Sequence, residues 1–89
     1  MTIELTLIGK PGCHLCDDAI EVIERALADF SKTKPQQVVE VKHLNMLEHE
    51  DLIQKYAEEI PVLLINGKMH AYWRIDEERL MRALHALAK

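Results

Sequence analysis

Cys13 and Cys16 are the residues of this chain best suited to chemistry, and the chain has no other cysteines. Two residues separate them, so on a helix they would lie on neighbouring points of one face. Such a pair can exchange with another disulfide, because one thiolate attacks and the second thiol releases the product. A disulfide scaffold would carry more cysteines, so this spacing indicates redox chemistry or half of a metal site.

The two cysteines are expected to differ in role, because Gly9-Lys10-Pro11-Gly12 breaks the chain and a helical pattern begins at about Cys13. A thiol at a helix N-terminus faces free N–H groups and the positive end of the dipole. C-x-x-C thiols in such places have pKa values lowered to roughly 3.5–7.5 from about 8.5. We therefore expect an exposed Cys13 to be the nucleophile and a shielded Cys16 to be the resolving thiol.

Charged neighbours act on the Cys13 thiolate in both directions. Lys10 and a protonated His14 would stabilise it, whereas Asp17 and Asp18 would oppose it. Their balance does not fix a reduction potential. His14 is also interpreted simply as a solvated residue at the helix start.

A metal site is the main structural alternative. Zinc would need four ligands, and the chain offers five histidines besides the cysteines: His14, His43, His49, His70 and His85. None of them forms a second ligand pair at a convincing spacing, so we assign no metal ligand. An inert structural cysteine pair is the other alternative.

The elements that must position the cysteines follow from the hydrophobic periodicity. We predict a strand over Ile3–Ile8, a helix from about Cys13 to Phe30, an edge strand over Gln37–Leu44, and a helix from a capping box at Asn45 to about Glu58. Residues 31–36 are predicted to form a loop. The inner face of the second helix is predicted to comprise Leu52, Ile53, Tyr56 and Ala57.

The rest of the chain predicts a hairpin and a last helix. Pro61 opens a strand over Val62–Ile65, Asn66-Gly67 turns the chain, and Lys68–Trp73 returns. Trp73 is expected to be partly buried in packing, with a substrate-facing surface as the alternative. Asp76 is expected to cap a helix whose buried stripe comprises Leu80, Leu84 and Leu87. The order βαβαββα predicts an α/β fold, a four-stranded mixed sheet flanked by three helices, in one domain over residues 1–89.

The composition of the chain argues against several classes of protein. The chain has 89 residues, is 48% hydrophobic and carries a net charge of −4, with scattered basic residues, so we expect no nucleic-acid partner. Apolar stretches fall short of the about 20 residues that a spanning helix needs. The start of the chain lacks the pattern of a signal peptide. We therefore expect a cytoplasmic monomer that does not bind membranes.

The combination of motifs resembles the glutaredoxin-like branch of the thioredoxin superfamily, and within it small bacterial glutaredoxin-like proteins. It consists of Pro-Gly-Cys13-x-x-Cys16 after a strand, then Ile60-Pro61-Val62 before a hairpin. The resemblance spans essentially the whole chain. It implies a thioredoxin-like fold and dithiol–disulfide exchange on protein or low-molecular-weight disulfides.

The resemblance also implies roles for residues outside the cysteine pair. Lys10 matches a position that contacts the carboxylate of glutathione and supports the thiolate. Pro61 matches the cis-proline that sits against the C-x-x-C, and Ile60 would offer backbone hydrogen bonds to an extended substrate. With His14, these residues form the expected substrate-binding set.

One segment departs from the family pattern. Glutathione-using members follow the hairpin with Gly-Gly and an acidic residue, but this chain has Ala71-Tyr72-Trp73-Arg74-Ile75-Asp76. The departure argues against glutathione, although Asp76 or Arg74 could substitute. We expect no tightly bound cofactor. Besides the oxidoreductase, two hypotheses stay open: a redox-inactive binding module, and a metal or iron–sulfur carrier through Cys13.

Overall fold

A computed structural model describes residues 2–88, and its elements follow the predicted βαβαββα order with one added 3-10 turn. The sheet has the strand order β2-β1-β3-β4; β1 runs parallel to β2 and antiparallel to β3, and β3 and β4 form a hairpin. The mixed sheet of an α/β fold is therefore confirmed. The elements are β1 (Thr2–Gly9), α1 (His14–Thr33), β2 (Val38–Asn45), the 3-10 helix Met46–Glu48, α2 (Glu50–Tyr56), β3 (Val62–Ile65), β4 (Lys68–Tyr72) and α3 (Glu77–Ala88).

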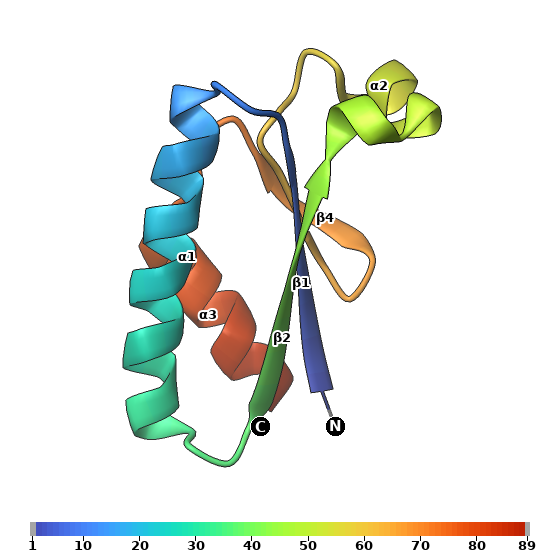
Figure 1. Cartoon of the computed structure of the whole chain (residues 1–89). Helices are drawn as coiled ribbons and strands as arrows, with labels where there is room; N and C mark the ends of the chain where they lie inside the picture. Colours follow the sequence, from blue (N-terminus) through green and yellow to red (C-terminus); the bar gives the residue numbers. More distant parts are fainter. Residues whose placement is uncertain (1, 89) are drawn as a thin grey trace.

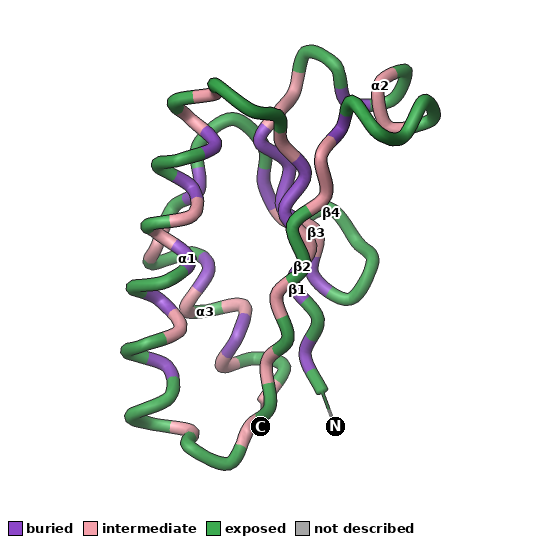
Figure 2. The backbone as a smooth tube through the Cα atoms, in the orientation of Figure 1, coloured by how far each residue is buried: buried purple, intermediate pink, exposed green. Residues whose placement is uncertain are grey.

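The helices cover the two faces of the sheet unequally (Figure 1). α1 and α3 pack on one face, and α2 lies against one end of the other. The larger core cluster joins Ile3, Leu5 and Leu7 of β1 to Phe30 of α1 and Leu84 of α3. A smaller cluster beneath α2 comprises Ile8, Met46, Tyr56 and Val62. In Figure 2, buried residues recur along the central strands and at helical spacing along α1.

The first helix is longer than the sequence predicts. It runs to Thr33 instead of ending near Phe30, so Ser31, Lys32 and Thr33 are helical and not part of a loop. None of these residues breaks a helix. Pro35 ends it, because the residue before a proline avoids helical angles, and Lys34 has φ −128° and ψ 65°.

The second predicted helix is interrupted. Asn45 caps a 3-10 turn, its Oδ1 accepting from the N–H of Leu47 at 2.9 Å, and His49 is then extended, with φ −135° and ψ 101°. This break lets Met46 enter the smaller cluster before α2 begins at Glu50. Ala57, expected on the inner face, is exposed because α2 ends at Tyr56.

Two further predictions about burial are wrong. Trp73 lies outside β4 and is 54% exposed, because its backbone turns out of the strand with φ 65°. Leu87 is 38% exposed, and the buried stripe of α3 comprises only Leu80 and Leu84, with Ala88 partly buried against the same core. Within residues 2–88, no helix is long and apolar enough to cross a membrane.

Candidate active site

The cysteine pair lies where β1 gives way to α1. Gly12 has φ +77°, a conformation that glycine adopts without steric cost, and it turns the chain after Pro11. Cys13 is the N-cap of α1, with φ −97° and ψ 111°. Its Sγ accepts a hydrogen bond from the N–H of Cys16 at 3.1 Å. The cysteine sulfur thus occupies the place that a capping oxygen usually takes at a helix start.

Cys13 and Cys16 form a disulfide, with their Cα atoms 5.2 Å apart. Cys16 is 5% exposed, as expected for a shielded thiol. Cys13 is half-buried, not fully exposed as predicted, because its sulfur is bonded to Cys16 and turned toward the helix start. His14 is exposed beside the pair. The disulfide therefore has a more accessible side at Cys13 and a buried side at Cys16.

Gly9 is a site residue that the sequence analysis missed. A Cβ atom at this position would lie 2.8 Å from Sγ and 3.3 Å from Cβ of Cys16. The 2.8 Å contact is closer than real Cβ atoms make, so the absence of a side chain leaves room for the buried sulfur. The available signal was a glycine at the end of a strand, which often marks close approach of another group.

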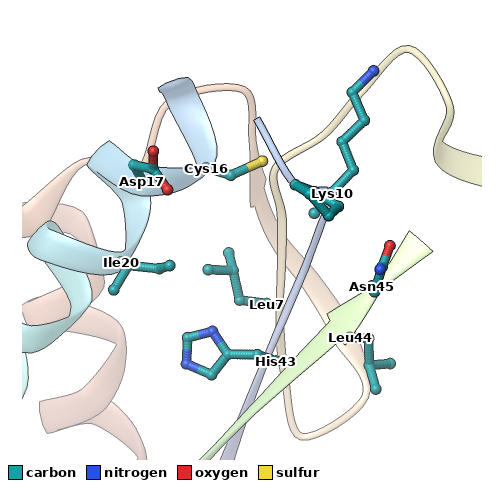
Figure 3. Close-up of a pocket in the computed structure, with 10 residues that line it drawn as sticks. Leu7, Lys10, Cys16, Asp17, Ile20, His43, Leu44 and Asn45 are labelled. Carbon is teal, nitrogen blue, oxygen red and sulfur yellow. The ribbon is translucent and has the colours of Figure 1, made fainter. Parts of the chain in front are cut away.

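A pocket of about 250 Å³ opens beside Cys16, between α1 and the end of β2. Figure 3 shows the Cys16 sulfur above Leu7 and Ile20, with the ring of His43 below them. Lys10 also lines this pocket, but its side chain extends away from it. Lys10 is exposed. The pocket adds an apolar recess with a polar rim on the Cys16 side of the disulfide.

The Ile60–Pro61 segment approaches the same end of the sheet from β3. Its peptide bond is cis. Ile8 pairs with Val62 in the antiparallel register, so continuing that register sets Pro61 across from Gly9. Pro61 is buried and Ile60 is half-buried. Pro61 is thus covered by its neighbours, whereas Ile60 is partly accessible.

Trp73 is tied directly to that segment, which the sequence analysis did not anticipate. Its N–H donates to the carbonyl oxygen of Pro61 at 2.9 Å and to that of Glu59 at 3.3 Å. Its Nε1–H donates to the carbonyl oxygen of Glu58 at 2.8 Å. These bonds connect the end of β4 to the entrance of β3.

His70 lies away from the disulfide, in β4. The β3–β4 register shifts between Leu63 and Leu64, which leaves His70 as the extra residue between the paired Met69 and Ala71. Burial, and then the positive charge of Arg79, lower the pKa of His70. Among residues 2–88, no three His, Cys, Asp or Glu side chains are grouped so that they could hold a metal ion.

Comparisons with known proteins agree with this geometry. A family model described as "Glutaredoxin-like domain (DUF836)" matches residues 4–85. A glutaredoxin-like protein of Dictyostelium discoideum is 26% identical over 99% of this chain and 81% of its own length. A structural-genomics target from X. campestris superposes with a TM-score of 0.71 at 28% identity, over 92% of this chain and 96% of that one.

A likeness to thioredoxin bears on the fold alone. A mutant thioredoxin from Halobacterium salinarum has a TM-score of 0.63 at 21% identity, over 98% of this chain and 75% of its own. The thioredoxin-like fold that the motifs implied is confirmed.

Proposed function

The chain belongs to the glutaredoxin-like domain family, and from that premise we propose that it is a dithiol thiol–disulfide oxidoreductase. Cys13 is the attacking thiolate and Cys16 the resolving thiol. The observation that carries the proposal is the disulfide at the start of α1, in which Cys13 is partly accessible and Cys16 is buried. That asymmetry suits a cycle in which the accessible sulfur attacks the substrate and the buried sulfur then resolves the mixed disulfide.

The cycle moves two electrons from the cysteine pair to a substrate disulfide. The Cys13 thiolate attacks one substrate sulfur, forming a mixed disulfide and releasing the other substrate sulfur as a thiolate, which takes up a proton. Cys16 then loses its proton and attacks Cys13, which re-forms the intramolecular disulfide and releases the second substrate thiol. The N–H of Cys16, which donates to Sγ of Cys13, would favour the Cys13 thiolate, because a hydrogen bond to a charged form stabilises it.

The proposed substrates are protein or low-molecular-weight disulfides. Lys10 would attract a carboxylate near the disulfide, and His14 is adjacent to the attacking sulfur. The backbone of Ile60, next to Pro61, would pair with an extended substrate. We propose a monomer without a tightly bound cofactor, working in a reducing compartment such as the cytoplasm, where thiols are kept reduced.

Reduction of insulin by dithiothreitol tests the proposal, because the separated insulin chain precipitates and the rate is read as turbidity. The wild-type protein should accelerate precipitation, and Cys13→Ser should abolish the acceleration. Val38→Ala is a suitable control, since Val38 is 55% exposed at the far end of β2. Thermal unfolding would show that each variant is folded. Full acceleration by Cys13→Ser would refute the assignment of the nucleophile.

A further inference from the structure

Trp73 holds a backbone conformation that is rare for a large side chain. Its φ of 65° lies in the left-handed region, which residues other than glycine, asparagine and aspartate seldom adopt. Such conformations persist only where the surrounding structure fixes them, and they cluster at functional sites. The contacts of Trp73 with its neighbours must therefore hold this conformation.

All of the hydrogen bonds that Trp73 donates go to one segment, residues 58–61. They reach the carbonyl oxygens of Glu58, Glu59 and Pro61 at 2.8, 3.3 and 2.9 Å. Ile60 lies between these bonded residues. In the part of the chain that the structure describes, neither the N–H nor the C=O of Ile60 forms a hydrogen bond. Trp73 thus fixes the residues on both sides of Ile60, whose own N–H and C=O are unpaired among the described residues.

Residues 58–61 lie at the same end of the molecule as the disulfide. Pro61 lies across from Gly9 in the extended register, and Gly9 abuts the sulfur of Cys16. In Figure 1, the β1–α1 connection, residues 57–61 and the β4–α3 connection all lie at the same end of the molecule. Trp73 is thus bonded to Pro61, and Gly9 lies against Cys16, at the same end of the molecule.

The ring of Trp73 remains accessible despite these bonds. Trp73 is 54% exposed and Tyr72 47% exposed, and their ring centroids are 5.2 Å apart. Both residues also border a cavity of about 490 Å³ whose other walls include His70, Arg74 and Arg79. The Nε1–H of Trp73 bonds to Glu58, two residues before Ile60, so a chain that paired with Ile60 could place an apolar side chain on the exposed ring.

We propose that Trp73 is a positioning and specificity-determining residue for extended polypeptide disulfides. It holds the peptide groups around Ile60 for backbone pairing, and its ring receives an apolar side chain adjacent to the substrate cysteine. This inference rests on the proposed thiol–disulfide exchange and adds a preference for polypeptides over small disulfides.

Two substrates separate this role from a general effect on activity. One is a peptide disulfide with leucine beside the cysteine, and the other is 2-hydroxyethyl disulfide. The selectivity is the ratio of their kcat/KM values. Glycine permits a positive φ, so Trp73→Gly should keep the backbone conformation. It should lower the selectivity about tenfold, through a higher KM for the peptide. A tenfold change is the upper end of what the loss of one hydrogen bond together with a ring contact is expected to cause.

Further variants separate the contribution of the Nε1–H hydrogen bond from that of the ring. Trp73→Phe retains a ring but loses the Nε1–H donor, so it should recover part of the selectivity. Trp73→Asn, which also tolerates a left-handed backbone, replaces Trp73→Gly if that variant fails to fold. Val38→Ala, at an exposed position far from the disulfide, should leave the ratio as in wild type.

Fluorescence gives a second readout, because Trp73 is the only tryptophan of the chain. In Cys16→Ser, the peptide and 2-mercaptoethanol can each be attached to Cys13 as stable mixed disulfides. The peptide adduct should shift the emission of Trp73 relative to the 2-mercaptoethanol adduct.

Equal selectivity of wild type and Trp73→Gly, with identical emission from the two adducts, would overturn this inference while leaving the proposed function standing. Failure of the wild-type protein to exchange with either disulfide would refute the proposed function itself.

Discussion

At the scale of single residues, the contact between Gly9 and Cys16 controls where the buried sulfur can lie. The space that a Cβ at Gly9 would need is occupied by Sγ of Cys16, 2.8 Å away. In the oxidised protein that sulfur is bonded to Cys13 and cannot turn away. In the reduced protein no S–S bond holds the Cys16 sulfur in that position.

Gly9→Ala should therefore destabilise the oxidised form more than the reduced form. Overpacking of this kind costs about 1–3 kcal/mol, and we expect the oxidised form to bear most of it. Urea unfolding of the protein with and without dithiothreitol measures the difference.

Gly12→Ala is the matched control for that substitution. Gly12 has φ +77° and nothing within 4 Å of a Cβ position, so alanine there strains the backbone at a cost of roughly 1–2 kcal/mol. The loss should be equal in the oxidised and reduced forms. An equal loss in both forms for Gly9→Ala as well would contradict the role given to Gly9.

At the scale of the elements, α3 depends on a cap that the sequence predicts correctly. Oδ1 of Asp76 accepts a hydrogen bond from the N–H of Arg79 at 3.1 Å. Ile75 and Leu80, on either side of the cap, are 7% and 0% exposed. The cap therefore sets the start of a helix that contributes Leu80 and Leu84 to the core.

Asp76→Ala should lower the free energy of unfolding by about 1 kcal/mol, and Asp76→Asn should recover most of that loss, since asparagine caps equally well. Chemical denaturation of the variants would measure both effects. Asp18→Ala provides the comparison, because Asp18 is exposed in the first turns of α1 and makes no side-chain hydrogen bond within residues 2–88. An Asp76→Asn variant as unstable as Asp76→Ala would show that the cap is not the cause.

The sequence predicts the bounds of an element well where a single local signal, such as a proline or a turn dipeptide, determines them. Strand β3 and the Asn66-Gly67 turn fall where Pro61 and the turn residues place them. The break at His49 was not predictable in this way, because a polar, extended residue between two helical turns has no local signature. It serves the packing of Met46 beneath α2, a contact between segments that the periodicity of one segment does not contain.

The same distinction holds within the site. The positions of Cys13 and Cys16 follow from their spacing and from the helix start. The role of Gly9 depends on how closely the start of α1 approaches the end of β1, and the role of Trp73 depends on contacts with residues 58–61. Both are contacts between elements, which the periodicity of one segment does not contain.

At the scale of the whole molecule, His70 links folding to pH. Its pKa is lowered by burial and then by the charge of Arg79, from an ordinary value of 6.5. The unfolded chain thus takes up a proton near pH 6.5 while the folded protein does so only at lower pH. The unfolded state holds more protons in that window, so stability falls as the pH drops below about 6.5.

His70→Gln should flatten this dependence. Between pH 7.5 and 5.5, the free energy of unfolding of the wild type should fall more steeply than that of His70→Gln. His49→Gln, which removes an exposed histidine, should retain the wild-type slope. Parallel curves for the wild type and His70→Gln would rule out His70 as the titrating group.

The proposed exchange requires a mixed disulfide on Cys13, and this intermediate can be trapped. Reduced Cys16→Ser and Cys13→Ser proteins would each be mixed with excess 2-hydroxyethyl disulfide, and the adducts followed by intact-protein mass spectrometry. We expect rapid accumulation of a stable adduct on Cys13 in Cys16→Ser, and a much slower reaction in Cys13→Ser. Faster modification of Cys16 in Cys13→Ser, or no adduct on Cys13, would contradict the proposed exchange.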